Sequence, residues 1–268
     1  MNLEPSASTP SLIESPAELL ERFESHAPGL VQIKPKVVFM KIEASDPAPV
    51  SMKINVPSSG IGSVTLLEAS ALVSLVKLVK PRKIFEFGTF LGYSTSLLVE
   101  NSADDCAVYS LDLGDSHVSD KPLAAFAEAD LRSDGDINDE YLRGAQGARG
   151  PHYTTALSAA DRSRLSLLQQ DSRKFDPADH GLEGSVDLVF VDGGHDTEIV
   201  TIDTANARKM VGDSGVIVFH DFNSNIHSDV TTFVNGLAKH EAIVCIQHTM
   251  LAILLVGQAG RDFLKIGA

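Results

Sequence analysis

The stretch from Lys83 to Ser94 constrains the fold more than any other part of the 268-residue chain. It reads KIFEFGTFLGYS: a short apolar run ends at an acid, two glycines frame a turn, and a helix-compatible segment follows. This is the pattern of a buried strand that delivers the chain to the carboxyl edge of a parallel sheet. There Gly88 permits a tight turn, and amides at a helix N-terminus face a ligand. The stretch therefore predicts a nucleotide-like cofactor site.

The glycine spacing separates two classes of cofactor. It reads E-x-G-x-x-x-G, from Glu86 through Gly88 to Gly92, and not the G-x-G-x-x-G of dinucleotide-binding proteins. This spacing favours S-adenosylmethionine (SAM) over NAD. An NAD-dependent oxidoreductase stays as an alternative, although the chain offers no clear Ser-Tyr-Lys or similar proton relay.

Alternating strand and helix patterns predict an α/β fold. Strand patterns cover 83–87, 107–111, 165–169, 186–191 and 215–219, and helical spacing covers 66–79, 92–100, 198–210 and 227–239. A capping box at Thr65 and Glu68 opens the first of these helices. The last two apolar runs, 242–246 and 251–256, are too close together for a crossover helix. We therefore expect a doubly wound, mostly parallel seven-stranded sheet that ends in an antiparallel C-terminal strand pair.

Two regions lie outside this regular pattern. Residues 1–62 are expected to form an N-terminal tail (1–10) followed by an irregular or helical arm, with many prolines in 28–60. The domain proper is expected over 63–268. Within it, residues 113–163 are acidic and thin in apolar side chains, and they read as an insertion over the active-site edge, with substrate specificity or a plain surface excursion as its role.

Composition excludes several classes of partner. The net charge of −14 lacks the basic footprint of a nucleic-acid binder and argues against binding anionic lipid. No apolar stretch reaches the ~20 residues that span a bilayer, and the N-terminus resembles no secretory signal. Cys106 and Cys245 lie in strand-like apolar runs and are expected to be buried free thiols. A cytoplasmic protein that acts on a small molecule is expected, and a homo-oligomer is compatible with the sequence.

Acids end successive strands, at the edge where parallel sheets bind ligands. Asp112 follows Gly88 by roughly the 20 residues typical of a ribose-binding acid. Asp171 ends the next strand and suits the amino group of adenine. Ser172 suits a helix cap that also donates to the ring. Asp is common at strand ends, so the argument rests on several strands ending this way together.

A second cluster, of acids and histidines, follows the fourth and fifth strands of the predicted sheet. Asp192-Gly-Gly-His195 places a histidine, the natural general base near neutral pH, one short turn from an acid. Neighbouring strands bring Asp192 and Asp221 together, and two oxygen ligands with waters suit Mg²⁺. His220 is a candidate third ligand, although imidazole suits other divalent metals better. The alternative is a structural His220 with no metal.

These motifs resemble a known family. The run Glu86–Gly92 resembles motif I of class I SAM-dependent methyltransferases. The segments 186–195, with Asp203, and 215–221 resemble the small-molecule O-methyltransferase group that includes macrolide-sugar and cephalosporin-biosynthesis relatives. The resemblance covers about residues 65–256 and implies a Rossmann-like methyltransferase fold. The chain departs from the metal-dependent members where His220 replaces the first acid of a pair.

The resemblance implies SAM-dependent methyl transfer to a hydroxyl oxygen of a small molecule, with or without Mg²⁺ or another divalent metal. It implies His195 and Asp192 as catalytic residues and Asp192, Asp221 and His220 as metal ligands. The expected cofactor contacts are Glu86, Phe87, Gly88, Thr89, Gly92, Tyr93, Ser94, Asp112, Leu113, Asp171, Ser172 and Asp192. A non-catalytic SAM-fold binding protein and a metal-dependent hydrolase remain alternatives.

Overall fold

The computed structural model describes residues 12–24, 28–55, 61–114 and 121–268. The expected tail at 1–10 lies outside the described residues, as do 56–60 and 115–120. Among the described residues, no helix is both long and apolar enough to cross a membrane. Cys106 and Cys245 are buried free thiols, as predicted.

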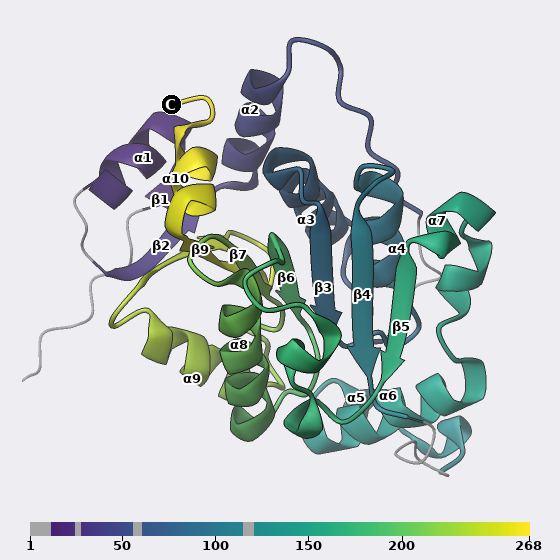
Figure 1. Cartoon of the computed structure of the whole chain (residues 1–268). Helices are drawn as coiled ribbons and strands as arrows, with labels where there is room; N and C mark the ends of the chain where they lie inside the picture. The colour runs from purple at the N-terminus through teal and green to yellow at the C-terminus, as the bar shows by residue number, and fades with distance from the viewer. Residues whose placement is uncertain (1–11, 25–27, 56–60, 115–120) are drawn as a thin grey trace, which may run out of the picture.

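Nine strands of the described chain form one sheet, in the order β1-β2-β8-β9-β7-β6-β3-β4-β5 (Figure 1). The strands are β1 (Leu12–Ile13), β2 (Gly29–Ile33), β3 (Lys83–Phe87), β4 (Ala107–Asp112), β5 (Leu165–Gln169), β6 (Leu188–Val191), β7 (Gly215–Phe219), β8 (Ala242–Ile246) and β9 (Ala252–Val256). Only β9 runs antiparallel to its neighbours, β7 and β8. The seven predicted strands and the terminal antiparallel pair are confirmed, and β1 and β2 widen the sheet beyond seven.

Helices cover both faces of the sheet, which confirms the doubly wound arrangement. One face carries α3 (Leu66–Val79), α4 (Tyr93–Asn101) and α10 (Gly257–Lys265), and the other carries α8 (Thr197–Val211) and α9 (Ser228–Leu237). Strand residues alternate between the two cores: Ile84 packs with the first group and Phe85 with the second. The capping box of α3 is present, since Glu68 N donates to Thr65 Oγ1 and Thr65 N donates to a Glu68 carboxylate oxygen.

Within the arm that was expected to be irregular or helical, residues 29–45 form a strand and a helix. β2 pairs in parallel with β8 along its whole length, and α2 (Pro35–Ser45) packs against α3. Pro35 stands at the start of α2, where its missing N–H costs nothing. One of the many prolines of this arm therefore begins a helix. Before β2, α1 (Pro16–Glu24) contacts α10.

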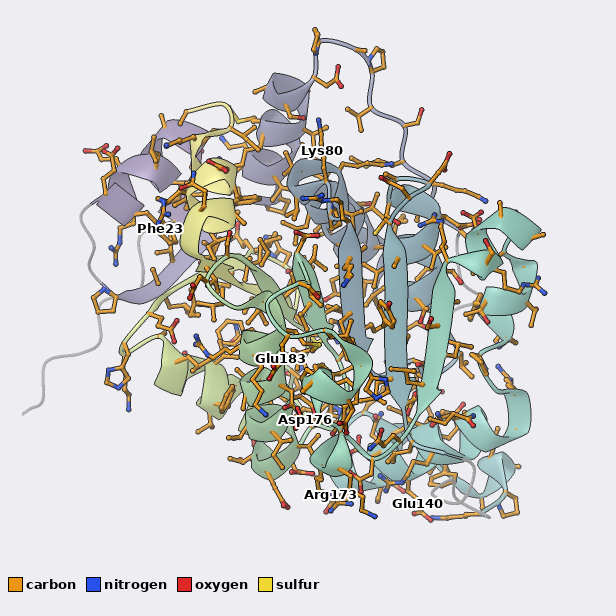
Figure 2. All side chains as sticks on the ribbon, viewed as in Figure 1. Phe23, Lys80, Glu140, Arg173, Asp176 and Glu183 are labelled. Carbon is orange, nitrogen blue, oxygen red and sulfur yellow. The ribbon has the colours of Figure 1, made fainter. Side chains whose placement is uncertain are left out.

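The described part of the insertion is helical. It contains η2 (Leu123–Ala125), α5 (Glu128–Leu131), α6 (Gly135–Arg149), η3 (His152–Ala156) and α7 (Ala159–Ser163). Two further short turns, η4 (Ser172–Lys174) and η5 (Pro177–His180), follow β5. Figure 2 shows Glu140 of α6 and Arg173 of η4 at the end of the molecule to which the strand arrows of β3, β4 and β5 point. The insertion thus reaches the carboxyl edge of the sheet.

Candidate functional site

A cavity of about 720 Å³ opens at the carboxyl edge of the sheet. Its volume is within the usual range for sites that enclose a small molecule or cofactor. Most of its wall comes from the turn after β3, the loops after β4 and β5, the loops after β6 and β7, and α6 of the insertion. Residues 61–64, the end of α5, α8 and Met250 complete it. The sheet therefore brings most of the strand-end residues that the sequence singled out to one enclosed space.

The turn after β3 has an unusual backbone. Gly88 has a φ of +91°, and a Cβ there would lie 1.9 Å from the carbonyl oxygen of Asp192. Phe90, a bulky residue, has a φ of +47°. Gly88 is thus required by the close packing of the turns after β3 and β6. Of the other predicted contacts, Phe87, Thr89, Tyr93 and Ser94 line the cavity.

Two of the predicted cofactor residues support the turn from behind. Gly92 caps α4 with a φ of +81° and packs against Thr154, and it is not part of the cavity lining. Glu86 is fully buried and is also absent from the lining. Its Oε2 accepts hydrogen bonds from Thr95 Oγ1 at 2.5 Å and Ser110 Oγ at 2.6 Å. The structure therefore places Glu86 as an internal tie between β3, β4 and α4.

The charge state of Glu86 follows from this burial. Its Oε1 has no hydrogen-bond partner among the described residues. Burial raises the pKa of Glu86 to about 7, against the opposing effect of the Ser110, Ser94 and Thr95 hydroxyls. Glu86 is therefore a buried carboxyl group that is partly protonated at neutral pH.

Asp112 and Leu113 line the cavity beyond the end of β4. The carboxylate of Asp112 accepts backbone hydrogen bonds from Phe90 at 2.5 Å and Leu113 at 2.7 Å. Burial raises its pKa, against these bonds. Each carboxylate oxygen has two acceptor positions, so Asp112 can tie down the turn after β3 and still accept from a ligand.

Asp171 and Ser172 line the cavity beyond β5, but Asp171 has an internal partner. Its two oxygens accept from the Arg173 side chain at distances from 2.7 to 3.1 Å. The Arg173 side chain holds the pKa of Asp171 at about 2. Asp171 is therefore an ionised carboxylate that is already paired with the guanidinium of Arg173.

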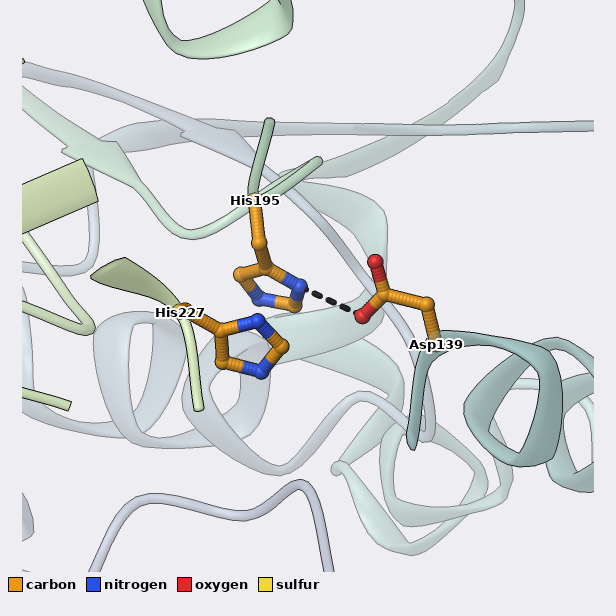
Figure 3. Close-up of side chains that lie close together, drawn as sticks. All are labelled: Asp139, His195 and His227. Atoms are coloured by element: carbon orange, nitrogen blue, oxygen red, sulfur yellow. Dashed lines mark hydrogen bonds and ion pairs between the residues drawn. The ribbon is translucent and has the colours of Figure 1, made fainter. Parts of the chain in front are cut away.

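His195 lies between two carboxylates. Its Nδ1 is 2.7 Å from Asp139 Oδ1, and its Nε2 is 3.1 Å from Asp221 Oδ2. Figure 3 shows the contact with Asp139, which comes from α6 of the insertion, and the neighbouring ring of His227. The two imidazole rings stack with centroids 3.8 Å apart. Three separate segments thus meet at the predicted base.

His220 bridges the acids of the second cluster. Its Nδ1 is 2.9 Å from Asp192 Oδ1 and 3.2 Å from Asp221 Oδ2, and its Nε2 is 3.6 Å from Glu68 Oε2. The potential metal-ligand atoms of Asp192, His195 and Asp221 lie within 4.8 Å of one another. Asp139, His195 and His227 form a second possible ligand set of the same kind among the described residues. His220 sits against the carboxylates of Asp192 and Asp221. Asp221 adopts a φ of +58°, an unusual conformation of the kind found at functional sites.

Burial and charge oppose each other in this cluster. Burial disfavours the protonated form of His195, but Asp221 and Asp139 outweigh it and raise the pKa to about 10. His220 behaves likewise: Asp192 and Asp221 raise its pKa well above the ordinary value despite burial. Burial and then the charge of His195 lower the pKa of His227. In the free protein, protonated imidazoles therefore neutralise the neighbouring carboxylates at neutral pH.

Sequence reasoning missed four contributors to this region. Asp139 was only one of many acids in the insertion, and its role depends on where α6 packs. His227 stands just before α9 and carries no motif. Glu68 was identified as a helix cap, yet it also faces His220. Asp203 was noted without a role, and it lines the cavity.

The turn after β3, the strand-end acids and the histidine cluster agree with the family comparison. A family described as "Methyltransferase domain" matches residues 85–222, just over half of the chain. The chain belongs to this methyltransferase family. The matched region runs from β3 to the residue after Asp221, so it contains both clusters described above.

Solved structures similar to this methyltransferase share little sequence with it. The O-methyltransferase TomG of Streptomyces achromogenes, involved in tomaymycin synthesis and solved with SAM, is 15% identical over 73% of this chain and 82% of its own, with a TM-score of 0.43. The SAH-bound methyltransferase PaMTH1 of Podospora anserina is 14% identical over 96% and 100%, with a TM-score of 0.47. An O-methyltransferase from Bacillus cereus in complex with SAH is 14% identical over 82% and 90%, with a TM-score of 0.41. No curated protein matches the chain.

Proposed function

We propose that this methyltransferase transfers the methyl group of SAM to a hydroxyl oxygen of a small molecule. The observation that carries the proposal is that one cavity is lined by both the E-x-G-x-x-x-G turn and the cluster of Asp192, His195 and Asp221. The turn supplies a cofactor site, and the cluster supplies groups that can hold or accept a proton. Family membership supports the reaction class.

We infer where the parts of SAM lie from the segments that line the cavity. The reacting methyl must face the proton-accepting cluster after β6 and β7, because methyl transfer needs the acceptor oxygen in line with the sulfonium. Asp112 then takes the ribose and the loop after β5 takes the base, while Thr89, Tyr93 and Ser94 lie beside the amino-acid portion. Acids around the cavity suit a cationic cofactor.

The reaction is a displacement. The acceptor oxygen forms a bond to the methyl carbon, the carbon–sulfur bond breaks, and its electron pair stays on sulfur to give SAH. The hydroxyl proton passes to the His195–Asp221 pair. His195 is protonated in the free protein at neutral pH, so it must give up that proton before it can accept the hydroxyl proton. Asp221 holds the imidazole in place and stays ionised, because His220 and His195 keep its pKa well below the ordinary value.

Asp192 and Asp221, with His195 beside them, fit a divalent cation, since carboxylate oxygens suit Mg²⁺ and a mixed oxygen and nitrogen set suits Mn²⁺ or Zn²⁺. A bound cation would lower the pKa of the acceptor hydroxyl.

The charge of the site also bears on the class of acceptor. An acidic, enclosed site suits a small molecule rather than nucleic acid, and two buried free thiols suit the cytoplasm.

Calorimetry with SAH and NAD tests the cofactor, and release of SAH across a panel of phenols, catechols and sugars tests the reaction. We expect SAH to bind and NAD not to bind. His195→Ala should lower turnover and leave SAH affinity nearly unchanged, because the side chain faces the acceptor end of the cavity. Binding of NAD without SAH, or ester hydrolysis in the absence of SAM, would overturn the proposal.

A further inference from the structure

Asp203 is a buried acid without a partner. It lies in the middle of α8 and is 1% exposed, and neither carboxylate oxygen has a hydrogen-bond partner among the described residues. It nevertheless lines the cavity. Leaving a buried polar group unsatisfied costs about 1–3 kcal/mol, and more for a charged group. A fold that keeps such a group facing a cavity points to a ligand that completes it.

The surroundings of Asp203 identify the part of the cavity it faces. A Cβ on Gly193 would lie 2.8 Å from Asp203 Oδ2, so the acid sits directly against the glycine loop after β6. α8 also packs against η4, which holds Ser172. Burial raises the pKa of Asp203 to about 7, and the nearby Ser172 hydroxyl opposes this rise without reaching hydrogen-bond geometry. Asp203 therefore belongs to the side of the cavity between the loops after β5 and β6.

Two acids, Asp171 and Asp203, lie at this side of the cavity. Only Asp203 has carboxylate oxygens that accept no hydrogen bond from the described residues. Asp171 is held by three contacts from the Arg173 side chain. Asp203 has no such contact, and Gly193 places no side chain against it. A ligand group that donates hydrogen bonds would find its unsatisfied acceptor at Asp203.

We propose that Asp203 accepts a hydrogen bond from the exocyclic amino group of the cofactor's adenine ring. The inference rests on the proposed function, because it takes the loop after β5 as the nucleobase end of a SAM site. A base bound between the loops after β5 and β6 would bring its amino group to this side of the cavity and supply the donor that Asp203 lacks. Ser172 and Asp203 together would then read the amino edge of the ring.

The experiment compares two ligands that differ only at this amino group. SAH and its 6-deamino analogue, in which a hydrogen replaces the amino group, are titrated by calorimetry into the wild type and Asp203→Ala. We expect the substitution to weaken SAH binding by about tenfold, the net value of one good hydrogen bond. The affinity for the 6-deamino analogue should change little. Without ligand, the variant should melt at the same or a higher temperature, since it loses an unsatisfied buried group.

Thr204→Val is the matched control. Thr204 is the next residue, is 3% exposed and has an unpartnered Oγ1 among the described residues, but it does not line the cavity. This variant should bind both ligands like the wild type. Equal weakening of both ligands by Asp203→Ala, or no change in SAH affinity, would overturn the inference. A wild type that binds neither ligand would instead overturn the proposed function, and the two failures are therefore distinguishable.

Discussion

Glu86→Gln should change the pH dependence of stability in a defined direction. The folded protein raises the pKa of Glu86 from the ordinary 4.5 to about 7. The folded state therefore binds this proton more tightly than the unfolded state. The stabilising effect is complete below pH 4.5 and is lost as the pH rises toward 7. The neutral amide cannot ionise, so the variant should lack this loss.

The magnitude follows from the two pKa values. Between pH 5 and pH 8, ionisation of Glu86 costs the wild type about 2.5 kcal/mol of unfolding free energy, at 1.36 kcal/mol for each unit of pKa difference. The amide also leaves N–H groups unpaired at the position of Oε1, which costs about 1–3 kcal/mol at every pH. Subtracting the effect of the substitution on stability at pH 5 from its effect at pH 8 removes this constant cost.

Urea unfolding of the wild type and Glu86→Gln at pH 5, 6, 7 and 8 measures this difference. We expect the variant to gain stability relative to the wild type as the pH rises, by about 2.5 kcal/mol over the range. SAH affinity should stay close to that of the wild type, because Glu86 does not line the cavity. A stability difference that is constant with pH, together with a large loss of SAH affinity, would show that Glu86 is ionised and contacts the cofactor.

Two further predictions concern the frame around the site. Lys41→Met should destabilise the fold by about 2–4 kcal/mol in thermal or urea unfolding, because the buried ammonium donates to the carbonyl oxygens of Phe263, Leu264 and Ile266 at the end of α10. Lys36 is exposed, so Lys36→Met should change stability by less than about 1 kcal/mol. Equal effects of the two substitutions would refute this role of Lys41. Gly88→Ala should destabilise by more than about 3 kcal/mol by circular dichroism melting, since its Cβ would collide with the Asp192 carbonyl, whereas Gly150→Ala, at a φ of +57° with open space around it, should cost about 1 kcal/mol. Equal melting temperatures for the two glycine variants would contradict the packing argument.

The central strands could be predicted because their signals are local. Each is a short apolar run bounded by turn residues, and most end in or are followed by an acid, as with Asp112 at the end of β4 and Asp192 after β6. The parallel arrangement then places these acids at one edge without further information. Asp112, Asp171, Asp192, His195 and Asp221 accordingly all line one cavity.

The rest depended on contacts between distant segments. β2 is a strand because it pairs with β8, near the other end of the chain, and no local pattern encodes that choice. Asp139 meets His195 only because α6 folds back over the carboxyl edge. Glu86 shows the converse: its position in the motif indicated a ligand contact, while the alternation along β3 turns its side chain into the core beneath α4.

The protonation states of His195 and His220 are linked, because both imidazoles contact Asp221. Asp139 and Asp221 hold a proton on His195, and Asp192 and Asp221 hold another on His220. Asp221 is common to both pairs, and its pKa is held well below the ordinary value by His220 and His195 in spite of burial. Any group that engages Asp221 therefore weakens the hold on both imidazolium protons at once. Because Asp139 belongs to the insertion, a shift of α6 on substrate entry would act on the same proton from the opposite side. The insertion is thus tied to His195 by an ion pair, in addition to lining the cavity.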